Sequence, residues 1–152
     1  MDADTALKKC RALCARQERS KHELRLRLEA WDVPERNAEQ VLLRLEKEDL
    51  LNEARFAEDF AVGHFRQKGW GKRMIQHALR SKELPERLIT VGLDAIDDTE
   101  YRAALASLVR KRFRMERAPD KFIREQRVIR YLVGRGWEPD AVRLAIAGIP
   151  KR

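Results

Sequence analysis

The stretch SKHELRLRL at residues 20–28 decides the fold, because its apolar pattern returns twice along the chain. GKRMIQHAL stands at residues 71–79, which is a shift of 51, and REQRVIRYL stands at residues 124–132, which is a shift of 104. Leu24 and Leu28 are four residues apart and therefore lie on one face of a helix. The residues that match this pair in the other two copies are Ile75 and Leu79, then Val128 and Leu132.

The same two shifts align the residues that follow. Val33-Pro34-Glu35 falls on Leu84-Pro85-Glu86 at the shift of 51. A second helical face also repeats: Ala38, Leu42 and Leu45 fall on Ile89, Leu93 and Ile96, and at the shift of 104 on Val142, Ile146 and Ile149. Agreement in two consecutive helices favours a triplicated unit over a chance match.

Each unit is predicted to hold three helices. Their expected ranges are 5–17, 20–30 and 34–49, then 52–68, 71–82 and 85–98, then 99–117, 120–133 and 139–147. The units themselves are expected at residues 1–51, 52–98 and 99–152. A unit this small buries little apolar surface alone and must share faces with its neighbours. We therefore predict an all-α protein whose three tandem three-helix units form an elongated, bent array.

Local signals support these boundaries. Ser20 and Glu23 have the spacing of a capping box, in which each side chain accepts a backbone N–H at the start of a helix. Pro34, Pro85 and Pro139 stand near the start of each third helix, where a missing N–H has no cost. Strong helix formers dominate a composition that is 43% hydrophobic and 38% charged.

Several classes of protein are disfavoured. The sequence has no run of eighteen apolar residues, so we expect no membrane span and no membrane partner. Met1-Asp2-Ala3-Asp4 does not resemble the start of a secretion signal. The two cysteines, Cys10 and Cys14, cannot build a disulfide framework and fit a reducing compartment, so we expect a cytoplasmic protein.

The net charge of +8 lies in the third unit. Residues 1–51 carry eleven basic and eleven acidic side chains, residues 52–98 carry eight of each, and residues 99–152 carry fourteen and six. The densest basic stretch runs from residue 110 to residue 114, and further cations follow it. The candidates for binding in this unit are Arg110, Lys111, Arg112, Arg114, Lys121, Arg124, Arg127 and Arg130.

A second asymmetry lies inside the middle unit. Residues 60–82 hold six basic side chains and no carboxylate, namely Arg66, Lys68, Lys72, Arg73, Arg80 and Lys82. A single basic cluster is as often a solvated face as a binding site. Two aligned asymmetries in one small protein favour a polyanionic neighbour, either nucleic acid or an acidic protein surface.

No catalytic constellation stands out. The turn at residues 69–71 is too short for a phosphate loop, and no nucleophile elbow occurs. Cys10 and Cys14 lack the second pair of ligands that a zinc site needs and are interpreted as small core residues. Core or turn packing is the favoured role of Trp31, Trp70 and Trp137. We therefore expect a binding protein that is not an enzyme and has neither cofactor nor metal.

Two stretches of the sequence resemble the RecX family. LCARQERSKHEL at residues 13–24 looks like the family's first signature. LLNEARFAEDF at residues 50–60, followed by GWGKRMI at residues 69–75, is similar to its central signature. Members often carry glycine after the second helix of a unit, as Gly136 does here, whereas Asp32 and Glu83 occupy the matching positions. If these turns need a positive φ, each would be strained by roughly 1 kcal/mol.

The resemblance implies a fold of tandem three-helix units and a partner, the RecA recombinase. It implies binding of the RecA–DNA filament and inhibition of strand exchange, ATP hydrolysis and coprotease activity in DNA repair and recombination. We expect a monomer that meets single- or double-stranded DNA weakly or through the filament. Two alternatives stay open. A stand-alone helical nucleic-acid-binding module would bind DNA tightly without RecA, and a protein adaptor indifferent to DNA would bind with little dependence on salt.

Overall fold

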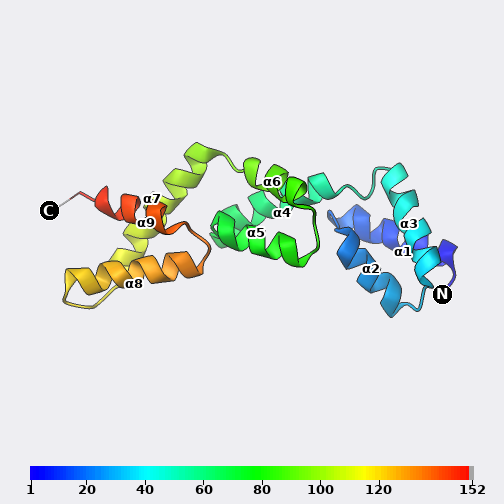
Figure 1. Ribbon diagram of the computed structural model, residues 1–152, viewed down its shortest axis with the longest axis horizontal. Coiled ribbons are helices and arrows are strands. Elements are labelled where there is room, and N and C mark those ends of the chain that lie inside the picture. Colours follow the sequence, from blue (N-terminus) through cyan, green and yellow to red (C-terminus); the bar gives the residue numbers. More distant parts are fainter. Residues whose placement is uncertain (151–152) are drawn as a thin grey trace. The chain divides into compact units, whose positions relative to one another are not determined.

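The computed structural model describes residues 1–150, and within them it contains nine helices and no strand (Figure 1). The helices are α1 (Ala3–Arg16), α2 (Lys21–Ala30), α3 (Glu35–Lys47), α4 (Glu53–Lys68), α5 (Lys72–Ser81), α6 (Glu86–Asp94), α7 (Asp98–Met115), α8 (Lys121–Gly134) and α9 (Pro139–Ala147). The all-α prediction is confirmed.

Most helices end within two residues of the expected bound, and the largest difference is at the end of α6. The sequence extends the third helix of the middle unit to residue 98, whereas α6 ends at Asp94. The reason is a cap on the next helix. Asp97 adopts an extended backbone, and its carboxylate accepts the N–H of Glu100 at 2.9 Å, so residues 95–97 form the turn that starts α7.

The chain divides into two compact units. The first comprises residues 1–59 and 79–92, and the second comprises residues 60–78 together with the described chain from Leu93 onward. In the first, α1 and α2 both pack against α3 (Figure 1). In the second, α7, α8 and α9 pack against one another.

The repeated apolar positions form the cores of these units. Every member of the series that begins with Leu24 and Leu28 is at most 1% exposed, which confirms the register. The members are Leu24, Leu28, Ile75, Leu79, Val128 and Leu132. The position at Val33 also repeats as a buried residue, as Leu84 and then Trp137.

The agreement is weaker at the end of the third repeat. Leu42 and Leu45 are buried in the core of the first unit. Their counterparts Ile146 and Ile149 are only half-buried. The third helix of the last repeat therefore leaves apolar surface uncovered.

The second helix of every repeat ends in the same turn. The amide of Val33 donates to the carbonyl of Leu28 at 3.0 Å, and the matching bonds are Leu84 to Leu79 at 3.4 Å and Trp137 to Leu132 at 3.1 Å. Such a turn needs a left-handed residue just before the donor. That residue has φ of 56° at Asp32, 61° at Glu83 and 96° at Gly136, so the predicted strain at the first two is present.

The capping box at α2 forms only in part. The hydroxyl of Ser20 accepts the N–H of Glu23 at 3.1 Å, as expected. The carboxylate of Glu23 instead accepts from the Arg19 guanidinium at 2.8 Å. Arg19 is buried and also donates to the carbonyl of Leu13 at 3.0 Å. The charged guanidinium is a stronger donor to this carboxylate than the backbone N–H of Ser20, because hydrogen bonds between two charged groups are the strong ones.

The left-handed turn predicts a difference between two variants of one residue. A Cβ atom at positive φ costs roughly 1–2 kcal/mol, so Glu83→Gly should be more stable than Glu83→Ala by about 1 kcal/mol. Both variants lose the contact between Glu83 and His22, which lie 3.1 Å apart, so the comparison isolates the backbone. Urea denaturation measures the difference, and equal stabilities would contradict the strain.

The repeat register predicts a contrast within α2. Leu24→Ala should lower the free energy of unfolding by about 2–5 kcal/mol, because it leaves a cavity in a closed core. Leu26→Ala, two residues along, should change it by no more than about 0.5 kcal/mol, because Leu26 is 53% exposed. Thermal or urea melting of the two variants checks this, and similar losses would refute the register.

Candidate polyanion-binding surface

Helix α7 has one buried face and one basic face. Tyr101, Leu105 and Val109 are buried at helical spacing. Arg110, Lys111 and Arg114 are exposed and lie on the other side of the helix. Their charged ends therefore point away from the core of the second unit.

These three cations have no partner among residues 1–150. The side chains of Arg110, Lys111 and Arg114 make no hydrogen bond or ion pair with any residue from 1 to 150. Some other surface arginines are paired, for example Arg25 with Glu39 at 2.8 Å and Arg55 with Glu18 at 3.0 Å. The basic excess on α7 is thus free to attract an external anion.

Helix α8 adds three more cations beside α7, against which it packs (Figure 1). Arg130 is exposed and has no partner among the described residues. Arg127 lies 3.6 Å from Glu116, and Lys121 lies 3.9 Å from Glu125. Both pairs are long and both cations are exposed, so the pairs are weak and the cations can turn to a phosphate.

Arg112 and Arg124 serve the fold instead. The Arg112 guanidinium stacks 3.8 Å from the ring of Tyr131 and lies 3.9 Å from Glu116. The Nη1 atom of Arg124 donates to the carbonyls of Ala118 at 2.7 Å and Pro119 at 2.9 Å. Arg112 thus joins α7 to α8, and Arg124 binds the backbone of the loop between these helices.

A second basic group surrounds the turn between α4 and α5. Lys68 and Arg73 are exposed, and within residues 1–150 their side chains lack partners. Arg66 makes two hydrogen bonds of 2.8 Å to Glu100, which hold the pKa of that carboxyl below its usual value. Lys72 lies 3.7 Å from Asp98 and 4.8 Å from the centre of the Tyr101 ring.

One cation of this group was missed by the sequence analysis. Arg135 sits in the turn between α8 and α9, and its Nη2 atom donates to the carbonyl of Lys68 at 2.9 Å. It lies outside the dense basic stretches, so local charge density could not reveal it. Arg135 and Lys68 are 67 positions apart in the sequence, and only the fold brings them into contact.

The first turn of α5 is closed by the turn between α8 and α9. The amides of Gly71 and Arg73 donate to the carbonyls of Arg135 and Gly136, each at 2.9 Å. The amide of Lys72 donates to the Tyr101 hydroxyl at 2.9 Å. The start of a helix is otherwise a favourable place for a phosphate. Here three of these donors are already used, so the start of α5 offers an anion mainly its side chains.

Aromatic rings stiffen the same junction. Trp137 is fully buried, stacks on Tyr101 at 4.4 Å between ring centres, and donates from Nε1 to the carbonyl of Gly69 at 3.0 Å. Burial raises the pKa of Tyr101 well above its usual range, so its hydroxyl stays protonated and lies 3.0 Å from a Glu138 carboxylate oxygen. Trp70 is half-buried against His64, with ring centres 4.7 Å apart. The predicted packing roles of Trp70 and Trp137 are confirmed.

Arg80 and Lys82 fall in the first compact unit, whereas the other twelve candidates fall in the second. Arg80 binds Glu86 through hydrogen bonds of 2.6 and 3.2 Å. The Lys82 ammonium lies 6.0 Å from the centre of the Phe56 ring. A continuous basic face that joins these two residues to α7 and α8 stays a prediction.

The Cys10 thiol and the His64 ring, two side chains with intrinsic reactivity, both pack against neighbouring residues. Cys10 is buried, and burial raises the pKa of its thiol to about 11, so the reactive thiolate is scarce at neutral pH. His64 lies against Phe60, with ring centres 3.8 Å apart. Among residues 1–150, no three His, Cys, Asp or Glu side chains gather where they could hold a metal ion. None of the described helices has the length and apolar character needed to cross a bilayer.

Comparison with known proteins identifies the repeats. Three family models match in order: the first three-helix domain of RecX at residues 6–45, the second at residues 52–93 and the third at residues 98–146. A solved structure described as regulatory protein RecX superimposes with a TM-score of 0.86 at 21% identity, covering 95% of this chain and 73% of that one. RecX from Lactobacillus salivarius also gives 0.86, at 16% identity and with 95% and 94% covered. Both structures show a shared fold.

Curated relatives carry the same name. The chain is 33% identical over 142 residues to regulatory protein RecX of Mycolicibacterium vanbaalenii, covering 88% of this chain and 77% of that protein. The RecX proteins of Acinetobacter baylyi (32% identical, 89% and 82% covered) and Streptomyces coelicolor (27%, 86% and 72%) are also similar. With all three domains matched in order and a relative at this identity, the chain belongs to the RecX family of regulatory proteins.

Proposed function

We propose that this chain is a cytoplasmic, monomeric regulator that binds the RecA filament on DNA and inhibits its strand exchange, ATP hydrolysis and coprotease activity. We name RecA as the partner because the sequence signatures at residues 13–24, 50–60 and 69–75 resemble those of RecX proteins. The membership of the family supports a regulatory role.

The observation that carries the proposal is the group of unpartnered cations on α7, in the repeat that carries the whole basic excess. The third repeat carries fourteen basic and six acidic side chains, and its helix α7 presents Arg110, Lys111 and Arg114 without partners within the described chain. A filament of protein on DNA offers a dense row of phosphates beside protein surface. Unpaired cations on a rigid helix would be attracted to it and would release its counterions on binding.

The candidate residues divide into two groups by their present partners. We propose that the filament is contacted first by those without partners or with weak ones, namely Lys68, Arg73, Arg110, Lys111, Arg114, Lys121, Arg127 and Arg130. Arg66, Lys72, Arg80, Arg112 and Arg124 already serve internal contacts, so we rank them lower. Lys82, beside the Phe56 ring, joins this lower group.

We also propose that the repeats act as three successive parts with different tasks. The expected limits are residues 1–51, 52–98 and 99–152. The first two are electrically balanced and would provide length and contacts to protein. The third, which carries the whole basic excess, would provide contact with phosphate.

The first functional prediction concerns activity. Near-stoichiometric or lower amounts of this chain should reduce ATP hydrolysis by RecA on single-stranded DNA, while the chain alone should hydrolyse no ATP. A coupled ATPase assay measures both. Unchanged RecA turnover over a wide titration, combined with tight binding of a labelled oligonucleotide without RecA, would favour the stand-alone nucleic-acid-binding module.

The second functional prediction concerns the cations of α7. The triple variant Arg110→Ala, Lys111→Ala and Arg114→Ala should weaken filament binding at low salt. Each contact with a single strand contributes about −0.7 to the slope of log affinity against log salt, so the slope should flatten by up to about 2. Helix content should not fall, because alanine favours helix more than these residues do.

A matched control is available in the first repeat. Arg16, Arg27 and Arg36 are also exposed, and changing them to alanine removes the same charge. This control triple should keep most of the affinity and the slope. If both triples weaken binding equally, net charge alone governs binding. If neither changes affinity or slope, the basic face is only solvated, and the adaptor alternative gains support.

A further inference from the structure

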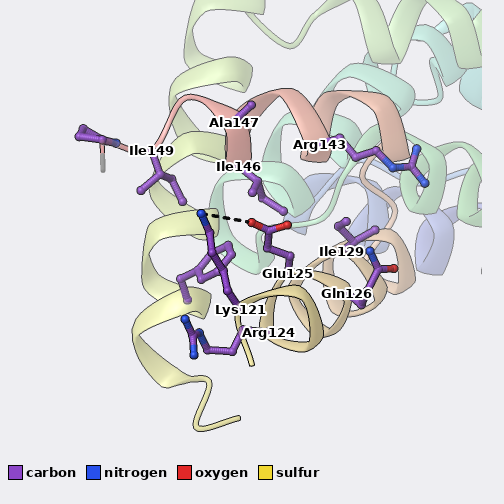
Figure 2. Close-up of a pocket in the computed structure, with 11 residues that line it drawn as sticks. Lys121, Arg124, Glu125, Gln126, Ile129, Arg143, Ile146, Ala147 and Ile149 are labelled. Atoms are coloured by element: carbon purple, nitrogen blue, oxygen red, sulfur yellow. Dashed lines mark ion pairs between the residues drawn. The ribbon is translucent and has the colours of Figure 1, made fainter. Parts of the chain in front are cut away.

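The third repeat contains an open apolar hollow. A cavity of about 750 Å³ lies among α7, α8, α9 and the residues that follow α9, within the range of roughly 300–1,000 Å³ typical of binding sites. Its apolar lining includes Phe113, Ile129, Ile146 and Ile149. Figure 2 shows Ile146 extending from α9 toward α8, where Glu125 and Ile129 face it.

The first repeat shows how such a hollow is filled. Leu42 and Leu45, the counterparts of Ile146 and Ile149, are at most 1% exposed. They belong to a core cluster that includes Leu51, with Leu50 packed against it. The amides of Leu50 and Leu51 donate to the carbonyl of Leu45 at 3.0 and 3.2 Å, which ties this pair of leucines to the end of α3.

The leucine pair is flanked by acidic residues. Its surrounding sequence, EKEDLLNEARFA at residues 46–57, carries four carboxylates, at Glu46, Glu48, Asp49 and Glu53. The structure of the first repeat thus gives the chemistry of an occupant: two adjacent aliphatic side chains with carboxylates on either side.

The hollow of the third repeat has the complementary charge. Three cations line it, namely Lys121, Arg124 and Arg143, against the single carboxylate of Glu125 among the described residues. Lys121 and Arg143 are held only by weak pairs, 3.9 Å to Glu125 and 3.2 Å to Asp140, and their side chains are 64% and 61% exposed. They can therefore turn toward an acidic ligand without losing a strong contact.

We propose that this hollow is a docking site for a partner protein's acidic segment that carries two adjacent leucine-like residues. The aliphatic side chains fill the space beside Ile146 and Ile149, and the flanking carboxylates meet Lys121 and Arg143. The site borders the basic face of α8 and shares Lys121 with the residues that we assign to phosphate, and it does not depend on the identity of the filament.

The test uses a fluorescently labelled synthetic peptide with the sequence of residues 46–57 and the full chain. Fluorescence anisotropy should show saturable binding with one peptide per chain. The peptide in which both leucines are replaced by asparagine should bind at least tenfold more weakly. Absence of saturable binding up to millimolar protein, or equal binding of the two peptides, overturns the proposal.

Two double charge reversals test the location. Lys121→Glu with Arg143→Glu should weaken peptide binding by roughly tenfold, because both residues line the hollow. Arg110→Glu with Arg130→Glu makes the same change in net charge on residues outside the lining and should alter peptide affinity less than twofold. Equal losses in the two variants would mean attraction by net charge alone and would overturn the site.

Two further measurements complete the test. Ile149→Asn should weaken peptide binding while the first repeat stays intact, so binding that survives unchanged would place the peptide elsewhere. Sedimentation should show the same mass for wild type and the Lys121→Glu, Arg143→Glu variant. If the wild type is a dimer that this variant dissociates, the occupant is a second copy of the chain and the proposal is wrong. Binding of single-stranded DNA by the same variants reports separately on the proposed function.

Discussion

The backbones of Gly71 and Gly136 approach each other so closely that neither residue can carry a side chain. A Cβ atom on Gly71 would lie 2.4 Å from the carbonyl carbon of Gly136, and one on Gly136 would lie 2.4 Å from the Cβ atom of Met74. This approach allows two carbonyls in the turn between α8 and α9 to accept hydrogen bonds from the amides of Gly71 and Arg73 at the start of α5. It also seats Trp137 beneath Gly69. The basic turn at Lys68 and the basic helix α7 are consequently held in one compact unit.

Local patterns in the sequence predicted the helices well. A pair of apolar residues four apart, such as Leu24 and Leu28, indicates which face of a helix is buried. The shifts of 51 and 104 locate the same buried face in the second and third repeats. The left-handed turns were also predictable, because Asp32 and Glu83 align with a glycine that has a positive φ. Both kinds of signal concern residues a few positions apart.

Contacts between distant residues escaped prediction. Arg66 and Glu100 are 34 positions apart, and no periodicity marks them as a pair. Arg112 looked like part of a charged run, yet it lies over the Tyr131 ring. Ile146 and Ile149 match core residues of the first repeat, but burial requires a neighbour to cover them. Whether a charge is free or paired, and whether an apolar face is covered, are properties of the tertiary structure.

The closure of α5 by residues from further along the chain limits the modularity of the repeats. Three N–H groups in its first turn are satisfied by Tyr101, Arg135 and Gly136, none of which belongs to the expected middle repeat. An unsatisfied amide donor in a buried position costs about 1–3 kcal/mol. The middle repeat therefore cannot be excised or duplicated as an independent building block, since the amides at the start of its second helix need acceptors from the third repeat. Sequence duplication has produced equivalent helices, but the folded protein joins residues 60–78 of the middle repeat to the last repeat in one compact unit.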